Sequence, residues 1–205
     1  MVTGAAIIDP KAFGGLLRAL NAYQGAPETF AALQLLPLTM VRPGELRASE
    51  WAEFDLDAAI WSIPAQRMKM RQPHRVPLAS QAVAILRDLK PITGDGKFLF
   101  PSVRSRARCM SENTINAALR RLGFDKDEMT GHGFRASASS ILNESGLWNP
   151  DAIERQLAHA NGNKIRRAYA RADFWQERVK MMTWWADKCD ELRRGGQVIP
   201  MRAGA

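Results

Sequence analysis

The chain has 205 residues, enough to bury a core as one domain or a domain and a half. Hydrophobic residues make up 46% and charged residues 24%, an ordinary globular balance that argues against a disordered chain. The formal net charge of +8 favours an anionic partner, with nucleic acid ahead of a membrane surface; the alternative is a merely basic protein.

The two cysteines, Cys109 and Cys189, lie far apart without CxxC spacing, so nothing in the sequence suggests a disulfide framework or a zinc site. No apolar run approaches ~18 residues, so we expect no membrane span. The first residues lack the charge pattern of a signal peptide. These observations together predict a cytoplasmic protein with two reduced thiols.

The first half of the chain predicts helices followed by a small sheet. Apolar residues recur at helical spacing over residues 11–22 and 30–36, with the second helix ending at Pro37. Pro43 suits the first position of a further helix that reaches about residue 50. Residues 54–57, 60–64 and 74–78 read as short strands, with a basic loop over residues 65–73.

The second half is predicted to be helical again. Ser80 is expected to cap a helix, and residues 101–110 are expected to form an irregular Pro/Ser/Arg loop. Further helices are expected over residues 111–122, from His132 to Gly146, from Asn149 onward, and over residues 174–188. The last of these carries an apolar stripe that includes Trp175, Val179, Met182, Trp184 and Trp185. The fold class is therefore mainly α with a small antiparallel β-sheet.

Residues 157–171 contain the most informative local pattern. His159 and Tyr169 lie a short turn apart among basic residues, and a tyrosine oxygen can act as a covalent nucleophile when its neighbours ease deprotonation. The other tyrosine, Tyr23, belongs to the first helix and is interpreted as a packing residue. Residues 161–163, Asn-Gly-Asn, offer a flexible joint before the nucleophile.

Several basic residues elsewhere could converge on Tyr169. Arg42 and Arg135 each offer a planar fork of donors that matches phosphate oxygens. His132 and Arg135 stand at positions i and i+3, on one face of a helix N-terminus. Lys69 lies at the tip of the basic loop, where it could donate a proton.

Each of these residues also has an ordinary structural interpretation. A single histidine at a helix start, such as His132 or His159, is more often a cap or a satisfied polar group. Lys69 could be a solvated charge, with Lys97 as a poorer rival. Glu45 could orient Arg42 or His132, or simply balance Arg42 or Arg47.

The ordered set resembles the tyrosine recombinase (phage integrase) family, and its prophage and genomic-island branch in particular. The resemblance covers about residues 13–187 and rests on the motifs TMVRPGEL around Arg42, the loop at Lys69, HGFR at 132–135, LAH at 157–159 and YAR from Tyr169. It implies an integrase catalytic-domain fold over residues 11–190. Residues 1–10 would be a linker or a boundary and residues 191–205 a flexible basic tail. N-terminal arm-binding and core-binding domains would be absent.

The resemblance implies phosphoryl transfer without metal or cofactor, through a 3′-phosphotyrosyl intermediate, with Tyr169 as the nucleophile. Arg42, Arg135 and His159 would hold the phosphate, His132 would be the general base and Lys69 the general acid. Glu45 would support Arg42 or His132. Candidate DNA contacts are Arg67, Arg71, His74, Arg75, Lys164, Arg166 and Arg167; His74 is also open to a structural interpretation.

The implied partner is the double-stranded DNA of an attachment site, bound by a homotetramer that is a monomer when free. Accessory DNA-bending or directionality proteins would assist, and no membrane would be involved. Two alternatives remain open from the sequence: a type IB topoisomerase, which shares the chemistry, and a DNA-binding remnant without full activity.

Overall fold

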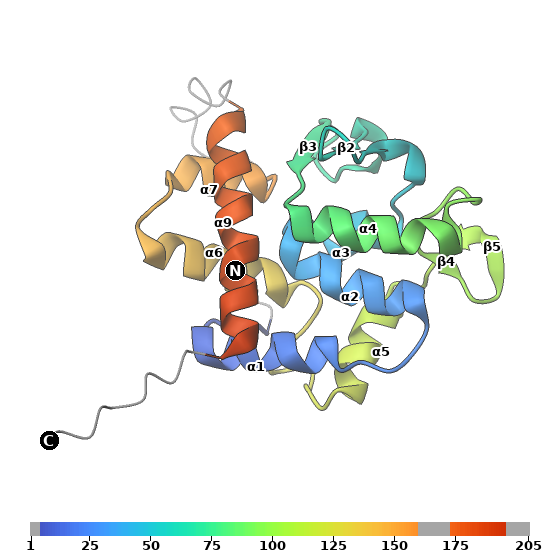
Figure 1. The fold of residues 1–205 in the computed structure, drawn as a ribbon, viewed down its shortest axis with the longest axis horizontal. Helices are drawn as coiled ribbons and strands as arrows, with labels where there is room; N and C mark the ends of the chain where they lie inside the picture. The colour runs from blue at the N-terminus through green and yellow to red at the C-terminus, as the bar shows by residue number, and fades with distance from the viewer. Residues whose placement is uncertain (1–4, 160–172, 196–205) are drawn as a thin grey trace, which may run out of the picture.

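The computed structural model of the chain describes residues 5–159 and 173–195 (Figure 1). Within these residues helices predominate, beside a three-stranded antiparallel sheet in the order β1-β2-β3 and a two-stranded β4-β5 sheet. The predicted mainly α fold with a small antiparallel sheet is confirmed. In chain order the elements are α1 (Pro10–Asn21), α2 (Pro27–Thr39), α3 (Pro43–Arg47), η1 (Trp51–Glu53), β1 (Phe54–Asp55), β2 (Ile60–Ile63), η2 (Ala65–Arg67), β3 (His74–Pro77), α4 (Ser80–Thr93), β4 (Pro101–Ser102), β5 (Ser105–Cys109), α5 (Asn113–Arg121), α6 (Gly133–Ser145), α7 (Pro150–Gln156) and α9 (Trp175–Arg194).

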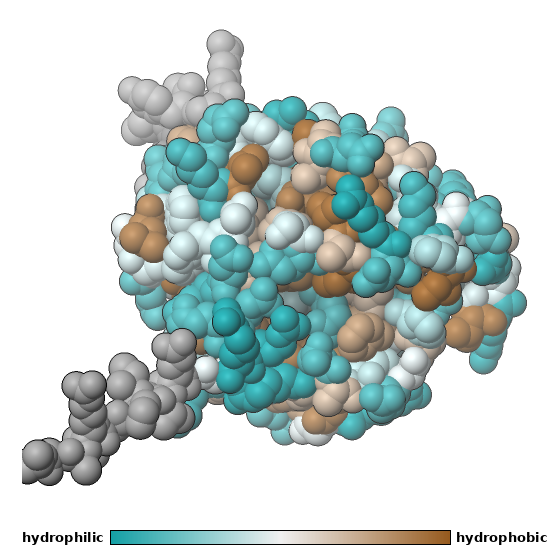
Figure 2. Space-filling view, in the orientation of Figure 1, coloured by the Kyte–Doolittle hydropathy of each residue, from teal (hydrophilic) through white to brown (hydrophobic). Residues whose placement is uncertain are grey.

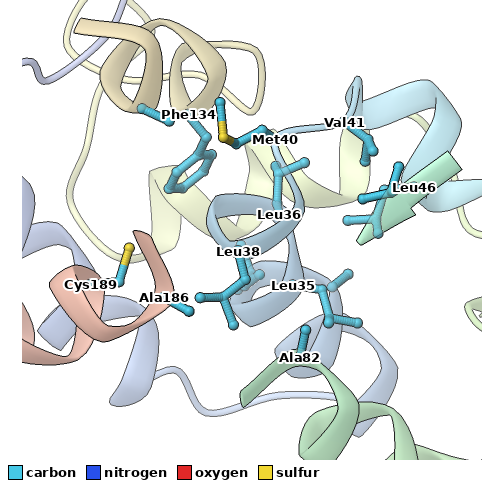
Figure 3. Close-up of a cluster of buried hydrophobic side chains, with 14 of the residues drawn as sticks. Leu35, Leu36, Leu38, Met40, Val41, Leu46, Ala82, Phe134, Ala186 and Cys189 are labelled. Atoms are coloured by element: carbon cyan, nitrogen blue, oxygen red, sulfur yellow. The ribbon is translucent and has the colours of Figure 1, made fainter. Parts of the chain in front are cut away.

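Helix α2 is the centre of the core. Apolar residues lie on all of its sides, as expected for a helix that is surrounded by protein, and α1, α4, α5, α6 and α9 all pack against it. Figure 3 shows Leu35 over Ala82 of α4 and Leu38 toward Ala186 of α9. Each fully buried leucine stabilises the fold by roughly 1.5–3 kcal/mol relative to an exposed one.

The C-terminal end of α2 lies further along the chain than predicted. The helix passes through Pro37 and ends at Thr39, followed by Met40 in the left-handed conformation with φ of 59°. A proline in the last turn removes only one N–H from the helix ladder, so the helix tolerates it there. Because α2 extends this far, the carbonyl groups of Thr39 and Met40 become available to side chains of other elements.

Helix α9 packs on its own chain, against α1, α2 and α7 (Figure 1). Trp185 is fully buried, and its Nε1 donates a hydrogen bond to the Pro37 carbonyl at 2.8 Å. Phe13 of α1 lies beside it, with ring centroids 5.8 Å apart. The helix continues beyond the predicted residue 188 to Arg194. Val179, predicted as part of the apolar stripe, is 36% exposed.

The three-stranded sheet follows the predicted strands closely. Trp61 pairs with Val76 and Ile63 pairs with His74, and these residues are buried while Ser62 between them is exposed. This alternation is the burial pattern of a sheet with one face on the core. The connection between β2 and β3 contains Lys69, whose side chain is exposed.

Two further local predictions were wrong. Residues 101–110 do not form an irregular loop, because β4 and β5 pair as a hairpin whose Arg106 contacts Asp95 at 2.7 Å. Strand β4 is partly buried, strand β5 is mainly exposed, and neither shows an apolar alternation, so the pattern contained no strand signal. Ser80 does not cap α4: Ala79 occupies the cap position, and the Ser80 hydroxyl donates to Gln81 Oε1.

On the face shown in Figure 2, hydrophilic side chains predominate and the hydrophobic patches are small and separated. Among residues 5–159 and 173–195, no helix is both long and apolar enough to cross a membrane.

Candidate active site

A wide cleft of about 720 Å³ opens beside the start of α3. It brings together Arg42, Lys69 and His132, which come from the start of α3, the β2–β3 connection and the turn before α6. A cleft with several cations on its walls suits an anionic ligand. The full lining is Arg42, Pro43, Gly44, Glu45, Gln66, Arg67, Met68, Lys69, Arg71, Asn116, Thr130 and His132.

Arg42 is held in place from two sides. Its Nη1 donates to Glu45 Oε1 at 2.7 Å, and its backbone N–H donates to Glu45 Oε2 at 2.9 Å. On the other side, its Nη2 donates to the carbonyl of Ala158 at 3.1 Å. Arg47 instead donates to the Met110 carbonyl. Of the partners considered for Glu45, the geometry therefore favours Arg42 over Arg47.

Arg135 lies in the first turn of α6 and is only 4% exposed. Its Nη1 donates to the Met40 carbonyl at 2.5 Å and its Nη2 to the Leu157 carbonyl at 2.6 Å. Burial, and then the charge of Arg42, lower the pKa of Arg135 to about 10, so the guanidinium stays charged at neutral pH. A guanidinium has five N–H groups, so about three remain for an anion.

His132 precedes α6 and is exposed on the cleft wall. Partial loss of hydration lowers the pKa of His132, and the charges of Arg135, Arg42 and His159 lower it further. The imidazole is therefore mainly neutral at pH 7, the form that accepts a proton. His159, three residues past the end of α7, is oriented by Glu154, whose Oε2 lies 2.9 Å from its Nδ1.

The basic residues of the β2–β3 connection divide into two groups. Lys69 and Arg71 are exposed at the cleft. Arg67 also lines the cleft, but it is partly buried, forms an ion pair with Glu53 and donates to the Glu45 carbonyl. The sequence pattern of alternating cations could not separate these two environments.

Two other predicted DNA contacts have partners within the protein. Arg75 pairs with Asp173 at 2.8 Å, and its guanidinium carbon lies 4.3 Å from the centre of the Trp175 ring. The predicted phosphate contact of His74 is wrong for this structure, because the side chain is 2% exposed. Its Nε2 donates to the Gln156 carbonyl at 3.1 Å. Burial, with the charges of Arg178 and Arg155, lowers the pKa of His74 to about 3.

Some predicted residues lie outside the part of the chain that the structure describes. They are the nucleophile Tyr169, the candidate DNA contacts Lys164, Arg166 and Arg167, and the joint at residues 161–163. Among the described residues, no group of three or more His, Cys, Asp or Glu side chains could hold a metal ion.

Sequence reasoning missed three polar residues behind the cleft: Gln156, Asp173 and Arg178. Asp173 contacts Arg75, Arg155 and Arg178. Burial favours a higher pKa for Asp173, but the hydrogen bond from Arg75 and the charges of Arg178 and Arg155 outweigh it and lower the pKa. Gln156 and Arg178 are buried although they lie on helices, where polar residues usually face solvent, so the pattern contained no signal for their burial.

Solved structures of several integrases share this fold. The integrase of mycobacterium phage Brujita superposes with a TM-score of 0.64 at 17% identity, covering 83% of this chain and 55% of that one. A lambda integrase dimer bound to a core site superposes with a TM-score of 0.57 at 21% identity, covering 84% of this chain and 61% of that one. Identities this low support a common fold alone.

The sequence itself gives the family. The sequence model of the phage integrase family matches residues 8–175, and the chain belongs to that family. It is 47% identical over 195 residues to the integrase of Enterobacteria phage P4, covering 88% of this chain and 44% of that protein. It is 47% identical over 162 residues to the prophage integrase IntA of Escherichia coli K12, covering 79% and 39% respectively. The resemblance to tyrosine recombinases of prophage type is confirmed, and the chain spans under half the length of these two relatives.

Proposed function

We propose that this chain contains the catalytic domain of a site-specific DNA recombinase. The observation that carries the proposal is the shared cleft of Arg42, Lys69 and His132, with Arg135 held directly behind Arg42 by the end of α7. These side chains supply a phosphate-binding pair, a general acid and a general base. Residues 11–190 would form this domain.

The two arginines would bind the non-bridging oxygens of the scissile phosphate. Both guanidiniums are already fixed by hydrogen bonds to backbone carbonyls, so little reorganisation accompanies the reaction. Negative charge that develops on the phosphoryl oxygens in the transition state would meet two fixed cations. His159, oriented by Glu154, would add a further donor to the same phosphate.

Tyr169 would attack the phosphorus and form a phosphorus–oxygen bond, while the bond to the 5′ oxygen of the next nucleotide breaks. His132 would accept the tyrosine proton, and Lys69 would donate a proton to the leaving 5′ oxygen. A tyrosine has an ordinary pKa of about 10, so it needs such a base at neutral pH. The covalent 3′-phosphotyrosyl link would retain the bond energy for rejoining to a second strand.

The partner would be double-stranded DNA carrying an attachment site. Lys69 and Arg71 at the cleft would contact phosphates, and Lys164, Arg166 and Arg167 would extend the contact beside the nucleophile. Phosphate contacts of this kind position a protein without reading bases, so binding should weaken steeply with salt. A homotetramer would form on the DNA, assisted by accessory bending or directionality proteins.

A covalent trap tests the proposal. The chain is incubated with a pool of duplexes that carry randomised cores and a nick near the cleavage position, so that the cleaved strand diffuses away. Adducts are separated on a denaturing gel, and their DNA is sequenced. We expect an adduct with the wild-type chain and with Tyr23→Phe, which removes the other tyrosine hydroxyl of the chain, and none with Tyr169→Phe.

An adduct that persists in Tyr169→Phe would refute the assignment of the nucleophile. If neither the chain nor a chimera with the N-terminal half of the phage P4 integrase forms an adduct, the enzyme proposal is wrong.

The role of Lys69 has a separate test. Lys69→Ala should slow cleavage by about 100- to 10,000-fold, the usual contribution of general acid–base catalysis. A substrate with sulfur in place of the 5′ oxygen needs no proton on its leaving group and should restore the rate. Lys97→Ala removes an exposed lysine that pairs with Glu50, and it should leave cleavage unchanged. Absence of rescue would show that Lys69 is not the general acid.

A further inference from the structure

The end of α7 presents three successive carbonyl oxygens to side chains from other elements. A helix C-terminus leaves its last carbonyl groups without partners in the helix, and its dipole favours positive charge there. These oxygens therefore suit arginine donors. The Gln156 carbonyl accepts from His74 at 3.1 Å, the Leu157 carbonyl from Arg135 at 2.6 Å, and the Ala158 carbonyl from Arg42 at 3.1 Å.

The Gln156 side chain fixes this turn from behind. It is 0% exposed, and its Nε2 donates to the Thr39 carbonyl at 3.1 Å. Its Oε1 accepts from both Nε and Nη2 of Arg178, at 3.0 and 2.8 Å. The amide thus joins the end of α7 to the end of α2, where Met40 accepts the second hydrogen bond of Arg135.

Arg178 of α9 completes the support. It is also 0% exposed, donates to Asp173 Oδ1 at 3.1 Å, and donates to the Arg75 carbonyl in β3. Burial of a charged group contributes little to stability compared with an apolar side chain of similar volume, even where the charge is paired. A fully buried guanidinium with this many partners is better explained by the geometry that it imposes on α7.

We propose that Gln156 and Arg178 are positioning residues for the Arg42–Arg135 pair, an inference that rests on the proposed recombinase function. They act through the backbone of residues 157 and 158, whose carbonyls orient the two guanidiniums. Neither side chain lines the cleft. Misplacement of catalytic groups by about 1 Å can slow a reaction about 100-fold, so small movements of this turn should have large effects.

Two substitutions test the proposal without removing an active-site side chain. Gln156→Glu keeps the acceptor for Arg178 and loses the donor to Thr39. Arg178→Lys keeps the charge and loses the planar fork, and it remains available if Gln156→Glu fails to fold. Thr93→Val is the matched control: Thr93 is 1% exposed and donates to the Leu99 carbonyl at 3.0 Å, but it lies at the end of α4.

The first measurement is the rate of covalent adduct formation on the duplex selected from the randomised pool. It is made at a temperature where circular dichroism shows every variant folded. We expect both variants to react about 10- to 100-fold more slowly than the wild type, and Thr93→Val to react at the wild-type rate.

The second measurement does not depend on catalysis. The chain has three histidines, so the His132 imidazole can be assigned and titrated by NMR. Partial loss of hydration contributes most to its lowered pKa, the charges of Arg135 and Arg42 lower the pKa further, and Glu45 opposes them. Displaced guanidiniums should move the pKa of His132 upward toward about 6.5 in both variants, and not in Thr93→Val.

The outcomes separate the two proposals. If the wild type forms an adduct, and the variants match Thr93→Val in both rate and His132 titration, the positioning role is wrong and the recombinase function stands. If neither the wild type nor its chimera with the N-terminal half of the phage P4 integrase forms an adduct, the proposed function fails, and the His132 titration alone decides whether these residues position the arginines.

Discussion

Gly14 and Gly15 of α1 form a natural pair for measuring how closely α1 and α9 pack. A Cβ atom added at Gly14 would lie 2.4 Å from the backbone oxygen of Leu192 in α9. A Cβ added at Gly15 would meet only the Arg18 guanidinium, at 3.8 Å. Arg18 also donates to that Leu192 oxygen, at 3.1 Å, so a shift at Gly14 would disturb this hydrogen bond too.

Gly14→Ala and Gly15→Ala should gain the same stability from helix propensity, but only Gly14→Ala should lose stability through overpacking. Replacing a glycine with alanine inside a helix stabilises it by about 0.8–1.0 kcal/mol. At Gly14 the contact with a backbone atom forces the helices apart, and overpacking of this kind costs about 1–3 kcal/mol. Gly15→Ala should therefore stabilise the protein by about 1 kcal/mol, whereas Gly14→Ala should be less stable than Gly15→Ala by about 1–3 kcal/mol.

Urea unfolding followed by circular dichroism measures this difference directly. A gap of about 2 kcal/mol corresponds to about 4–8 °C in Tm for a chain of this size. Each variant is the control for the other, because both positions lie in the same helix and share its gain in propensity. Equal stabilities for the two variants would refute the close approach of α1 and α9.

Three further predictions concern the polar residues of the site. His74 is neutral in the folded protein and becomes protonated on unfolding at acidic pH, so its contribution to the free energy of unfolding should be complete above pH 6.5 and should be lost as the pH falls toward 3. Between pH 7 and pH 5 the wild type should lose about 2 kcal/mol of this free energy in urea unfolding, and His74→Gln should not show this loss. The rate of adduct formation should rise with pH through an inflection below 6.5, reflecting the lowered pKa of His132; an inflection above 6.5 would contradict its role as base. Glu45→Gln should slow adduct formation by about 10- to 100-fold, because it removes the carboxylate that orients Arg42. Glu50→Gln alters an ion pair with Lys97 and should leave the rate unchanged. Equal rates for the two variants would refute the orienting role of Glu45.

Most of the fold could be predicted because its helices begin and end with strong local signals. Asn149 accepts from the Asp151 N–H and Pro150 follows it, as predicted for the start of α7. Gly146 ends α6 with φ of 65°, a conformation that glycine adopts readily. The β4–β5 hairpin and the passage of α2 through Pro37 were missed because packing and pairing decided them, not local preference.

The cleft was predictable in part. Arg42, Lys69 and His132 were expected to converge, and they line the same cleft. The buried support was not predictable, because it depends on which face of α7 and α9 turns inward. Gln156 and Arg178 have the same residue types as solvated helix positions, and only the tertiary arrangement places them inside.

The carbonyl groups at the end of α7 also have a consequence for sequence variation. Because the backbone supplies these acceptors, a change of side chain at Leu157 or Ala158 cannot delete them, whereas insertion or deletion of one residue would move both out of register. Ala158 has φ of 49°, a conformation that glycine adopts without strain. Variation at this turn should therefore be strict in length, with glycine favoured at position 158 and an apolar residue kept at Leu157, which is 1% exposed in the core.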